Sequence, residues 1–91
     1  SEEEKQAIIE GIAKSGGVEW LPIAQLALED SSPEIRILGF RLYNVYGEND
    51  RIPVLVKGLF DNNEYVNKFA GNTLIKIGQP ALPYVHKIIA L

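Results

Sequence analysis

Apolar and polar positions along this chain follow a pattern that occurs twice. Residues 33–47 read PEIRILGFRLYNVYG, residues 64–78 read EYVNKFAGNTLIKIG, and an aspartate, Asp30 or Asp61, comes three positions before each segment. When the first segment is laid on the second, Gly39 coincides with Ala70, so that small matches small. The apolar matches include Ile35 with Val66, Leu38 with Phe69, and Tyr43 with Leu74. We call the separation between Asp30 and Asp61 the repeat interval. A fixed interval of roughly 20–50 residues is typical of repeat architectures, so the pattern predicts a repeat protein.

Within each repeat the apolar positions recur every three or four residues, which predicts helices rather than strands. Cap residues and glycines mark where these helices begin and end. The expected long helices run from Ser1 to just before Gly16, over 33–46, and over 64–77. Shorter helices are expected over 20–29, from about residue 50, and from residue 80 or 81. Ser32, Asn63 and Asp50 are the predicted caps of the third, fifth and fourth helices.

These helices predict a single all-α domain over 1–91. We expect three antiparallel helical hairpins, with repeats over about 1–29, 30–60 and 61–91, stacked as a right-handed α-solenoid. Three hairpins are the minimum at which stacking buries a continuous core.

The best-formed repeat resembles a known motif. Its residues Asp30, Pro33, Arg36, Gly39 and Gly47 precede a second helix that ends LVKGLFD. This phrase resembles the short HEAT-like repeat of bilin-lyase-type and related scaffold proteins. The resemblance implies a helical-repeat scaffold in which the second helix of each hairpin lines the concave side.

Gly39 and Arg36 of this motif are expected to have structural roles. Glycine inside a helix costs about 1 kcal/mol relative to alanine. We therefore expect Gly39, like Ala70, to lie where helices cross closely. Arg36 is expected to bind a carboxylate, such as Asp30 or Asp61, in a ladder between repeats.

Composition is that of an ordinary soluble protein, because 46% of the 91 residues are hydrophobic and 23% are charged. The chain has no cysteine, which fits a reducing compartment, and we expect a cytoplasmic protein. No apolar run approaches the roughly 20 residues that cross a bilayer, and residues 1–6 do not resemble a signal peptide. We expect no membrane contact.

The chain has a net charge of −3, and its charged residues are distributed unevenly along the sequence. Residues 1–31 carry seven acidic and two basic side chains, whereas residues 62–91 carry three lysines and one glutamate. A net negative charge repels polyphosphate at long range, so we do not expect a nucleic-acid partner.

Catalytic and metal-binding patterns are not recognisable. His86 is the only histidine, and a lone imidazole is expected to be an ordinary surface residue rather than a metal ligand. No serine lies in a recognisable triad, and no phosphate-binding glycine motif occurs. We expect a protein that is not an enzyme and has no metal and no cofactor.

A binding surface is the remaining function, and the resemblance places it on the second helices. Two matched columns should face outward there: Leu26, Lys57 and Lys87, and Glu29, Phe60 and Ala90. An exposed aromatic such as Phe60 is a plausible anchor for a partner, although packing of its ring between repeats is an equal alternative. Trp20 is expected to pack more than to bind. The candidate surface comprises Trp20, Arg51, Lys57, Phe60, His86 and Lys87.

The last helix carries apolar residues on more than one face: Tyr84, Val85, Ile88, Ile89 and Leu91. A closing repeat normally turns a polar face to water. We therefore expect self-association or further repeats through this end.

These observations predict a non-catalytic protein–protein interaction scaffold of unknown partner. One alternative is an accessory subunit or lyase-like protein that holds a small cofactor between repeats. Another is a weak nucleic-acid-binding HEAT module that uses Arg51, Lys57 and Lys87.

Overall fold

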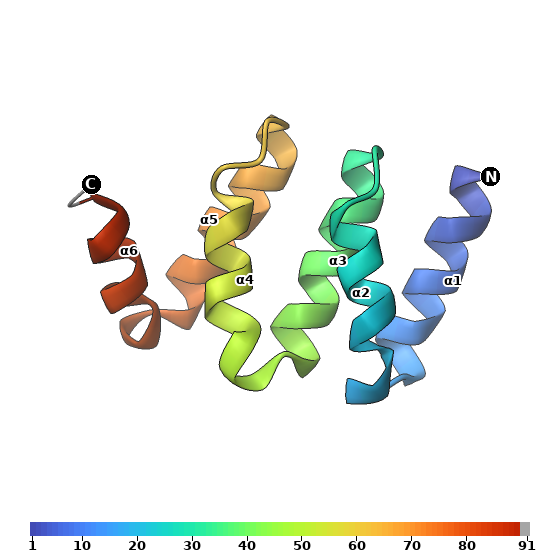
Figure 1. Ribbon diagram of the computed structural model, residues 1–91, viewed down its shortest axis with the longest axis horizontal. Coiled ribbons are helices and arrows are strands. Elements are labelled where there is room, and N and C mark those ends of the chain that lie inside the picture. The colour runs from blue at the N-terminus through green and yellow to red at the C-terminus, as the bar shows by residue number, and fades with distance from the viewer. Residues whose placement is uncertain (90–91) are drawn as a thin grey trace.

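The computed structural model is built of helices (Figure 1). It describes residues 1–89, except for the side chains of Ala13, Ser15, Ile88 and Ile89. No strand occurs in residues 1–89, which confirms the prediction of an all-α protein. The α-helices are α1 (Glu2–Ser15), α2 (Leu21–Leu28), α3 (Pro33–Tyr46), α4 (Arg51–Gly58), α5 (Glu64–Ile77) and α6 (Leu82–Ile89). The 3₁₀ helices are η1 (Val18–Trp20), η2 (Glu48–Asp50) and η3 (Gln79–Ala81).

The same three elements recur in each third of the chain: a 14-residue α-helix, a three-residue 3₁₀ helix and an eight-residue α-helix. The long helices begin at residues 2, 33 and 64. The repeat interval of the apolar pattern is therefore also the interval between the long helices. The short helices begin at residues 21, 51 and 82. The interval between the first two short helices is one residue shorter than the interval between the last two, because two glycines, rather than one, join α1 to η1.

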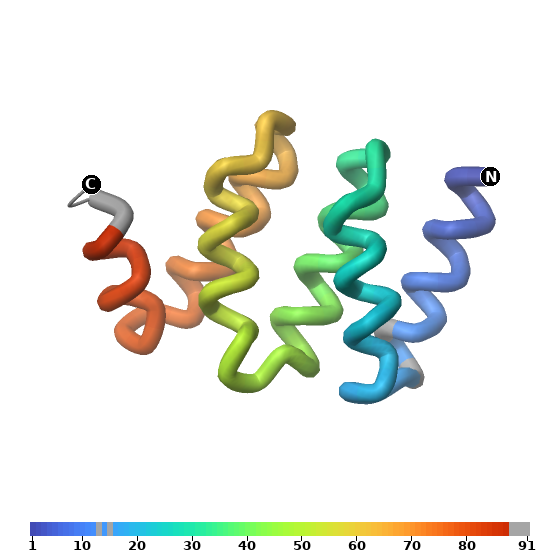
Figure 2. The backbone as a smooth tube through the Cα atoms, in the orientation of Figure 1, coloured from blue at the N-terminus to red at the C-terminus, as the bar shows by residue number. Residues whose placement is uncertain are grey.

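The helices follow one another along the longest dimension of the molecule, and successive helices run in opposite directions (Figures 1 and 2). The principal extents are 40 × 26 × 19 Å. α3 packs against α1, α2, α4 and α5, and α4 packs against α5 and α6.

The first and last pairs of helices differ from the expected hairpins, because α1 packs mainly against α3 rather than α2, and α6 packs against α4 rather than α5. Gly16 and Gly17, which join α1 to η1, both have extended backbone conformations. This extended connection carries the chain away from α1 before α2 begins.

Caps set the starts of the long helices, as predicted. The side-chain oxygen of Ser32 accepts a hydrogen bond from the backbone N–H of Ile35, and that of Asn63 accepts from Tyr65 and Val66. Ser1 caps α1 in the same way. The prediction that Asp50 caps the fourth helix is wrong. Asp50 lies in η2 with a helical backbone, and its side chain makes no capping bond, because this 3₁₀ helix leads directly into α4.

Two clusters of buried apolar side chains form the core. The first contains Ile9, Ala24, Ala27, Ile35, Leu38 and Leu42. The second contains Phe40, Leu55, Val66, Leu74 and Ala81. α3 contributes to both clusters, so it lies between the amino-terminal and carboxy-terminal halves of the core.

Small residues allow the closest helix contacts, as the sequence predicted for Gly39 and Ala70. A Cβ atom added to Gly39 would lie 3.0 Å from the carbonyl oxygen of Ala24. A Cβ atom added to Gly58 would lie 2.7 Å from the Cβ atom of Ala70. The α2–α3 and α4–α5 contacts therefore have no room for a larger side chain at either glycine.

Candidate binding surfaces

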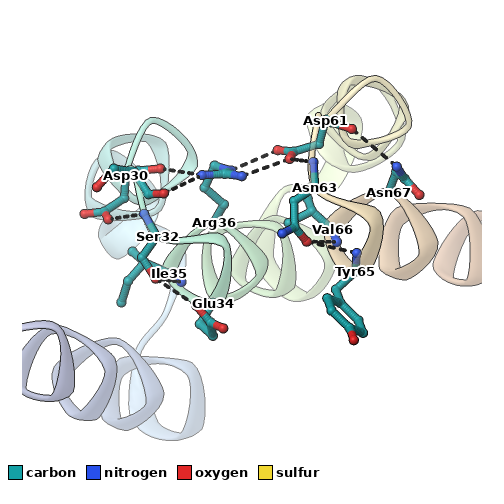
Figure 3. Close-up of polar contacts among 11 residues, drawn as sticks. Asp30, Ser32, Glu34, Ile35, Arg36, Asp61, Asn63, Tyr65, Val66 and Asn67 are labelled. Carbon is teal, nitrogen blue, oxygen red and sulfur yellow. Dashed lines mark hydrogen bonds and ion pairs between the residues drawn. The ribbon is translucent and has the colours of Figure 1, made fainter.

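A row of polar side chains connects the loops between repeats (Figure 3). Arg36 on α3 lies at the centre of this row. The Nε and Nη2 atoms of Arg36 donate to the two carboxylate oxygens of Asp61 at 2.9 Å each, and Nη1 donates to the carbonyl oxygen of Asp30 at 2.9 Å. The Arg36 and Asp61 side chains are only 14% and 12% exposed. This geometry confirms the expectation that Arg36 binds a carboxylate of the neighbouring repeat.

Equivalent contacts occur one repeat earlier and one repeat later. Lys5 donates from Nζ to Oδ2 of Asp30 at 3.0 Å, and Asn67 donates from Nδ2 to the carbonyl oxygen of Asp61 at 3.3 Å. Lys5, Arg36 and Asn67 follow one another at the repeat interval, as do Asp30 and Asp61. We call these five residues the polar ladder. Its regular spacing and its contacts within the chain give it a structural role.

Hydrogen bonds lower the pKa of both ladder carboxyls. The pKa of Asp61 lies below its ordinary value, chiefly because the Arg36 side chain donates to it and also because the backbone N–H of Asn63 does. The pKa of Asp30 is lowered chiefly by the backbone N–H of Ser32 and then by Lys5. Both groups therefore favour the ionised form more strongly in the folded chain than in the unfolded chain.

We expect the free energy of unfolding to decrease as the pH falls below about 4, near the ordinary pKa of aspartate. Because the pKa of Asp61 is lowered by folding, its contribution is complete above the unfolded pKa and is lost as the pH falls through the folded pKa. Urea unfolding at a series of pH values measures this decrease. Asp61→Asn should make the decrease shallower. An unchanged slope in that variant would contradict the role of Asp61.

The second-helix residues expected to face outward are exposed. Phe60, which follows α4, is 67% exposed, and Leu26 on α2 is 74% exposed. The alternative in which the Phe60 ring packs between repeats is therefore wrong. Glu29, Lys57 and Lys87 are also exposed. Ala90 lies outside the described residues.

The remaining candidate residues lie in different environments. Trp20 is 38% exposed, and a Cβ atom added to Gly16 would lie 2.6 Å from its Cδ1 atom, so the indole covers the connection after α1. His86 is exposed on α6. Arg51 is half-buried, and its Nε atom donates to Oδ1 of Asn44 on α3 at 2.8 Å. Arg51 thus lines a groove with α3 and α5, whereas Lys57 does not.

An apolar groove of about 460 Å³ lies at the α5–α6 end of the molecule. We call it the end groove. Its lining residues are Leu59, Gly71, Leu74, Ile75, Gly78, Gln79, Ala81, Leu82 and Val85. Ile75 is 77% exposed and Leu82 is 60% exposed. Branched apolar side chains at this exposure form an uncovered apolar surface.

Sequence reasoning predicted an uncovered apolar last helix but missed the part that α5 contributes. Val85 lines the end groove, and Tyr84 is 38% exposed. The side chains of Ile88, Ile89 and Leu91 lie outside those described. Ile75 was not predicted, although one signal was available. It comes one repeat interval after Asn44, so an apolar residue replaces a polar one in the repeat.

Comparison with known proteins gives no match. No protein-family model matches the chain, and neither a curated protein nor a solved structure does so. Within residues 1–89, no helix is both long enough and apolar enough to cross a lipid bilayer. Nor do three or more histidine, aspartate or glutamate side chains in that range gather as ligands for a metal ion.

Proposed function

We propose that this chain is a non-catalytic protein–protein interaction module of the HEAT-like repeat type. In this proposal residues 1–91 are three stacked repeats of a right-handed α-solenoid, over about 1–29, 30–60 and 61–91. Its support is the repeat interval that the long helices and the polar ladder share. Such a module acts by holding a surface in place for a partner.

The main support for this proposal is the end groove. Exposed apolar patches on soluble proteins commonly mark contacts, and a groove between helices is the site where an amphipathic helix lays its apolar face. Leu59 lines this groove, and the next residue, Phe60, is exposed. A large exposed aromatic that follows a groove residue in the sequence is a suitable anchor for a partner helix. The partner segment is therefore a helix with an apolar stripe.

Self-association is a second candidate, and the charge distribution favours it. Residues 1–31 have a net charge of −5, whereas residues 62–91 have a net charge of +2. Opposite charges at the two ends favour head-to-tail contact, and heterologous contacts of this kind need not close into a ring. A mass that increases with concentration in light scattering would identify the second copy as the partner. A constant monomer mass would exclude it.

A pull-down from cell lysate, with the 91-residue chain immobilised as bait, tests the main proposal. Ile75→Asp places a charge in the end groove, and Phe60→Ala removes the aromatic anchor. Both changes lie at exposed positions, so we expect both variants to fold and to lose a partner that the wild type retains. Ile8→Asp is the matched control, because Ile8 is 62% exposed on α1 at the other end of the molecule. Equal capture by all four proteins, or no capture by the wild type, would contradict the proposal.

A further inference from the structure

A second groove lies between α3 and α5 and has a volume of about 510 Å³. We call it the cationic groove. Its lining residues are Arg41, Asn44, Val45, Arg51, Phe69, Thr73, Lys76 and Ile77. They come from α3, from the first residue of α4, and from α5. Three helices that are joined by core packing therefore hold the groove in shape.

Three positive charges line this groove: Arg41, Arg51 and Lys76. No aspartate or glutamate is among its lining residues. The ion pairs formed among the described side chains use Lys5, Arg36 and Lys68 instead. In a chain with a net charge of −3, the groove is a local concentration of positive charge, and none of its three cations forms an ion pair within 4.0 Å with a described carboxylate.

Neighbouring groups orient both guanidinium groups. The Nε atom of Arg51 donates to Oδ1 of Asn44 at 2.8 Å, which leaves its two terminal nitrogens to donate elsewhere. The guanidinium carbon of Arg41 lies 5.9 Å from the centre of the Phe69 ring. Arginine held in this way presents a planar set of donors that matches the oxygens of a phosphate or carboxylate.

The groove is polar where the other repeats are apolar. α2 and α6 begin with Leu21 and Leu82, whereas α4 begins with Arg51. Thr73 comes one repeat interval after Leu42, which is only 1% exposed in the first core cluster. Thr73 is itself only 9% exposed, and its hydroxyl donates to the carbonyl oxygen of Phe69 at 2.7 Å.

Lys76 comes one repeat interval after Val45, which is 63% exposed, so here a charged residue replaces an exposed apolar one. A local interaction can explain the presence of each of two of these cations. Lys76 is in the last turn of α5, where a cation interacts favourably with the helix dipole, and Arg41 contacts an aromatic ring. These interactions do not account for three cations around one groove. Among the polar residues around this groove, Thr73 takes a position that belongs to the core one repeat earlier, and such local departures are expected at functional sites.

We propose that the cationic groove binds the phosphate group of a small organic phosphate. A phosphate monoester carries close to two negative charges at neutral pH, which suits a site with three cations. The side chains of Val45, Phe69 and Ile77 supply apolar wall for the organic part of the ligand. The volume lies within the range of about 300–1,000 Å³ that is usual for small-molecule sites. This site is separate from the end groove and does not depend on the proposed partner.

Nuclear magnetic resonance titration of the ¹⁵N-labelled 91-residue chain tests the proposal. The probes are phenyl phosphate, inorganic phosphate and succinate, in salt of about 0.15 M, which screens non-specific attraction beyond about 8 Å. We expect saturable shifts of the Arg41 and Arg51 side-chain N–H signals and of nearby α3 and α5 amides. Tighter binding of phenyl phosphate than of inorganic phosphate would identify an ester as the ligand. Equal affinities would identify the free anion and overturn the ester assignment.

Charge-removing variants make the test specific. Arg51→Gln and Lys76→Gln should each weaken phenyl phosphate binding about tenfold, because charged hydrogen bonds are the strong ones. Lys76 is exposed, so its variant remains informative if Arg51→Gln fails to fold. Lys57→Gln is the control, because it removes an equal charge from α4 outside the groove. No saturable shift, tighter binding of succinate, or equal weakening by Lys57→Gln would overturn the proposal.

Discussion

Replacement of Gly39 by leucine is expected to lower the free energy of unfolding by about 3 kcal/mol, at the upper end of the usual cost of over-packing. A Cβ atom at this position would lie 3.0 Å from the carbonyl oxygen of Ala24 and 3.1 Å from both the Cβ atom of Ala27 and Cδ2 of Leu28. The Leu28 side chain can move, but the backbone oxygen cannot move without shifting α2. Urea unfolding measures the change. For a chain of this size each kcal/mol corresponds to a decrease of about 4–8 °C in Tm.

Gly71→Leu is the matched control, because it makes the same substitution inside a helix. A Cβ atom on Gly71 would meet only Cδ2 of Leu59, at 3.6 Å, which is an ordinary contact distance. We expect the control to unfold at an equal or higher midpoint, since leucine favours a helix more than glycine does. Equal stability of Gly39→Leu and the wild type would show that α2 and α3 do not cross closely.

Asp61→Ala is expected to lower the free energy of unfolding by about 2 kcal/mol, because breaking a fully buried ion pair costs about 3–5 kcal/mol and partial exposure of this pair reduces the cost. The substitution removes both acceptors of the Arg36 fork and the acceptor for the backbone N–H of Asn63. Chemical denaturation monitored by circular dichroism measures the change.

An exposed ion pair provides the control for that substitution. Glu64 accepts from Lys68 at 2.7 Å, but the two side chains are 70% and 64% exposed. Surface pairs contribute about 0–1 kcal/mol, so Glu64→Ala should have a much smaller effect than Asp61→Ala. If the two substitutions cost the same, the polar ladder does not hold the repeats together.

The sequence predicted the long helices accurately because their ends carry local signals. The third and fifth helices were expected over 33–46 and 64–77, and α3 and α5 have these bounds. Ser32 and Asn63 cap their starts, and Gly47 and Gly78 follow their ends. The 3₁₀ helices were missed, since three residues are too few to show a periodicity. The packing of α1 on α3 was also missed, because it depends on the conformation of the glycine connection.

Single exposed residues were easier to predict than grooves. Phe60 was recognised as a candidate anchor from its place in the repeat, and it is exposed. The end groove needs Ile75 on α5 and Leu82 on α6, which line one groove only once the chain has folded. Likewise, Arg51 was grouped with Lys57 on the side that the second helices were expected to present, but the two residues are six apart on α4. At about 3.6 residues per turn, this separation places them on different faces of one helix.

The position of α3 in both core clusters has a consequence for unfolding. Each half of the molecule completes its interior with side chains from this one helix, Leu42 among those of the first cluster and Phe40 among those of the second. Local melting of α3 therefore exposes the interior of both halves at once. The 91 residues are expected to lose their structure in one cooperative event, unlike long repeat arrays, in which distant units can fray separately.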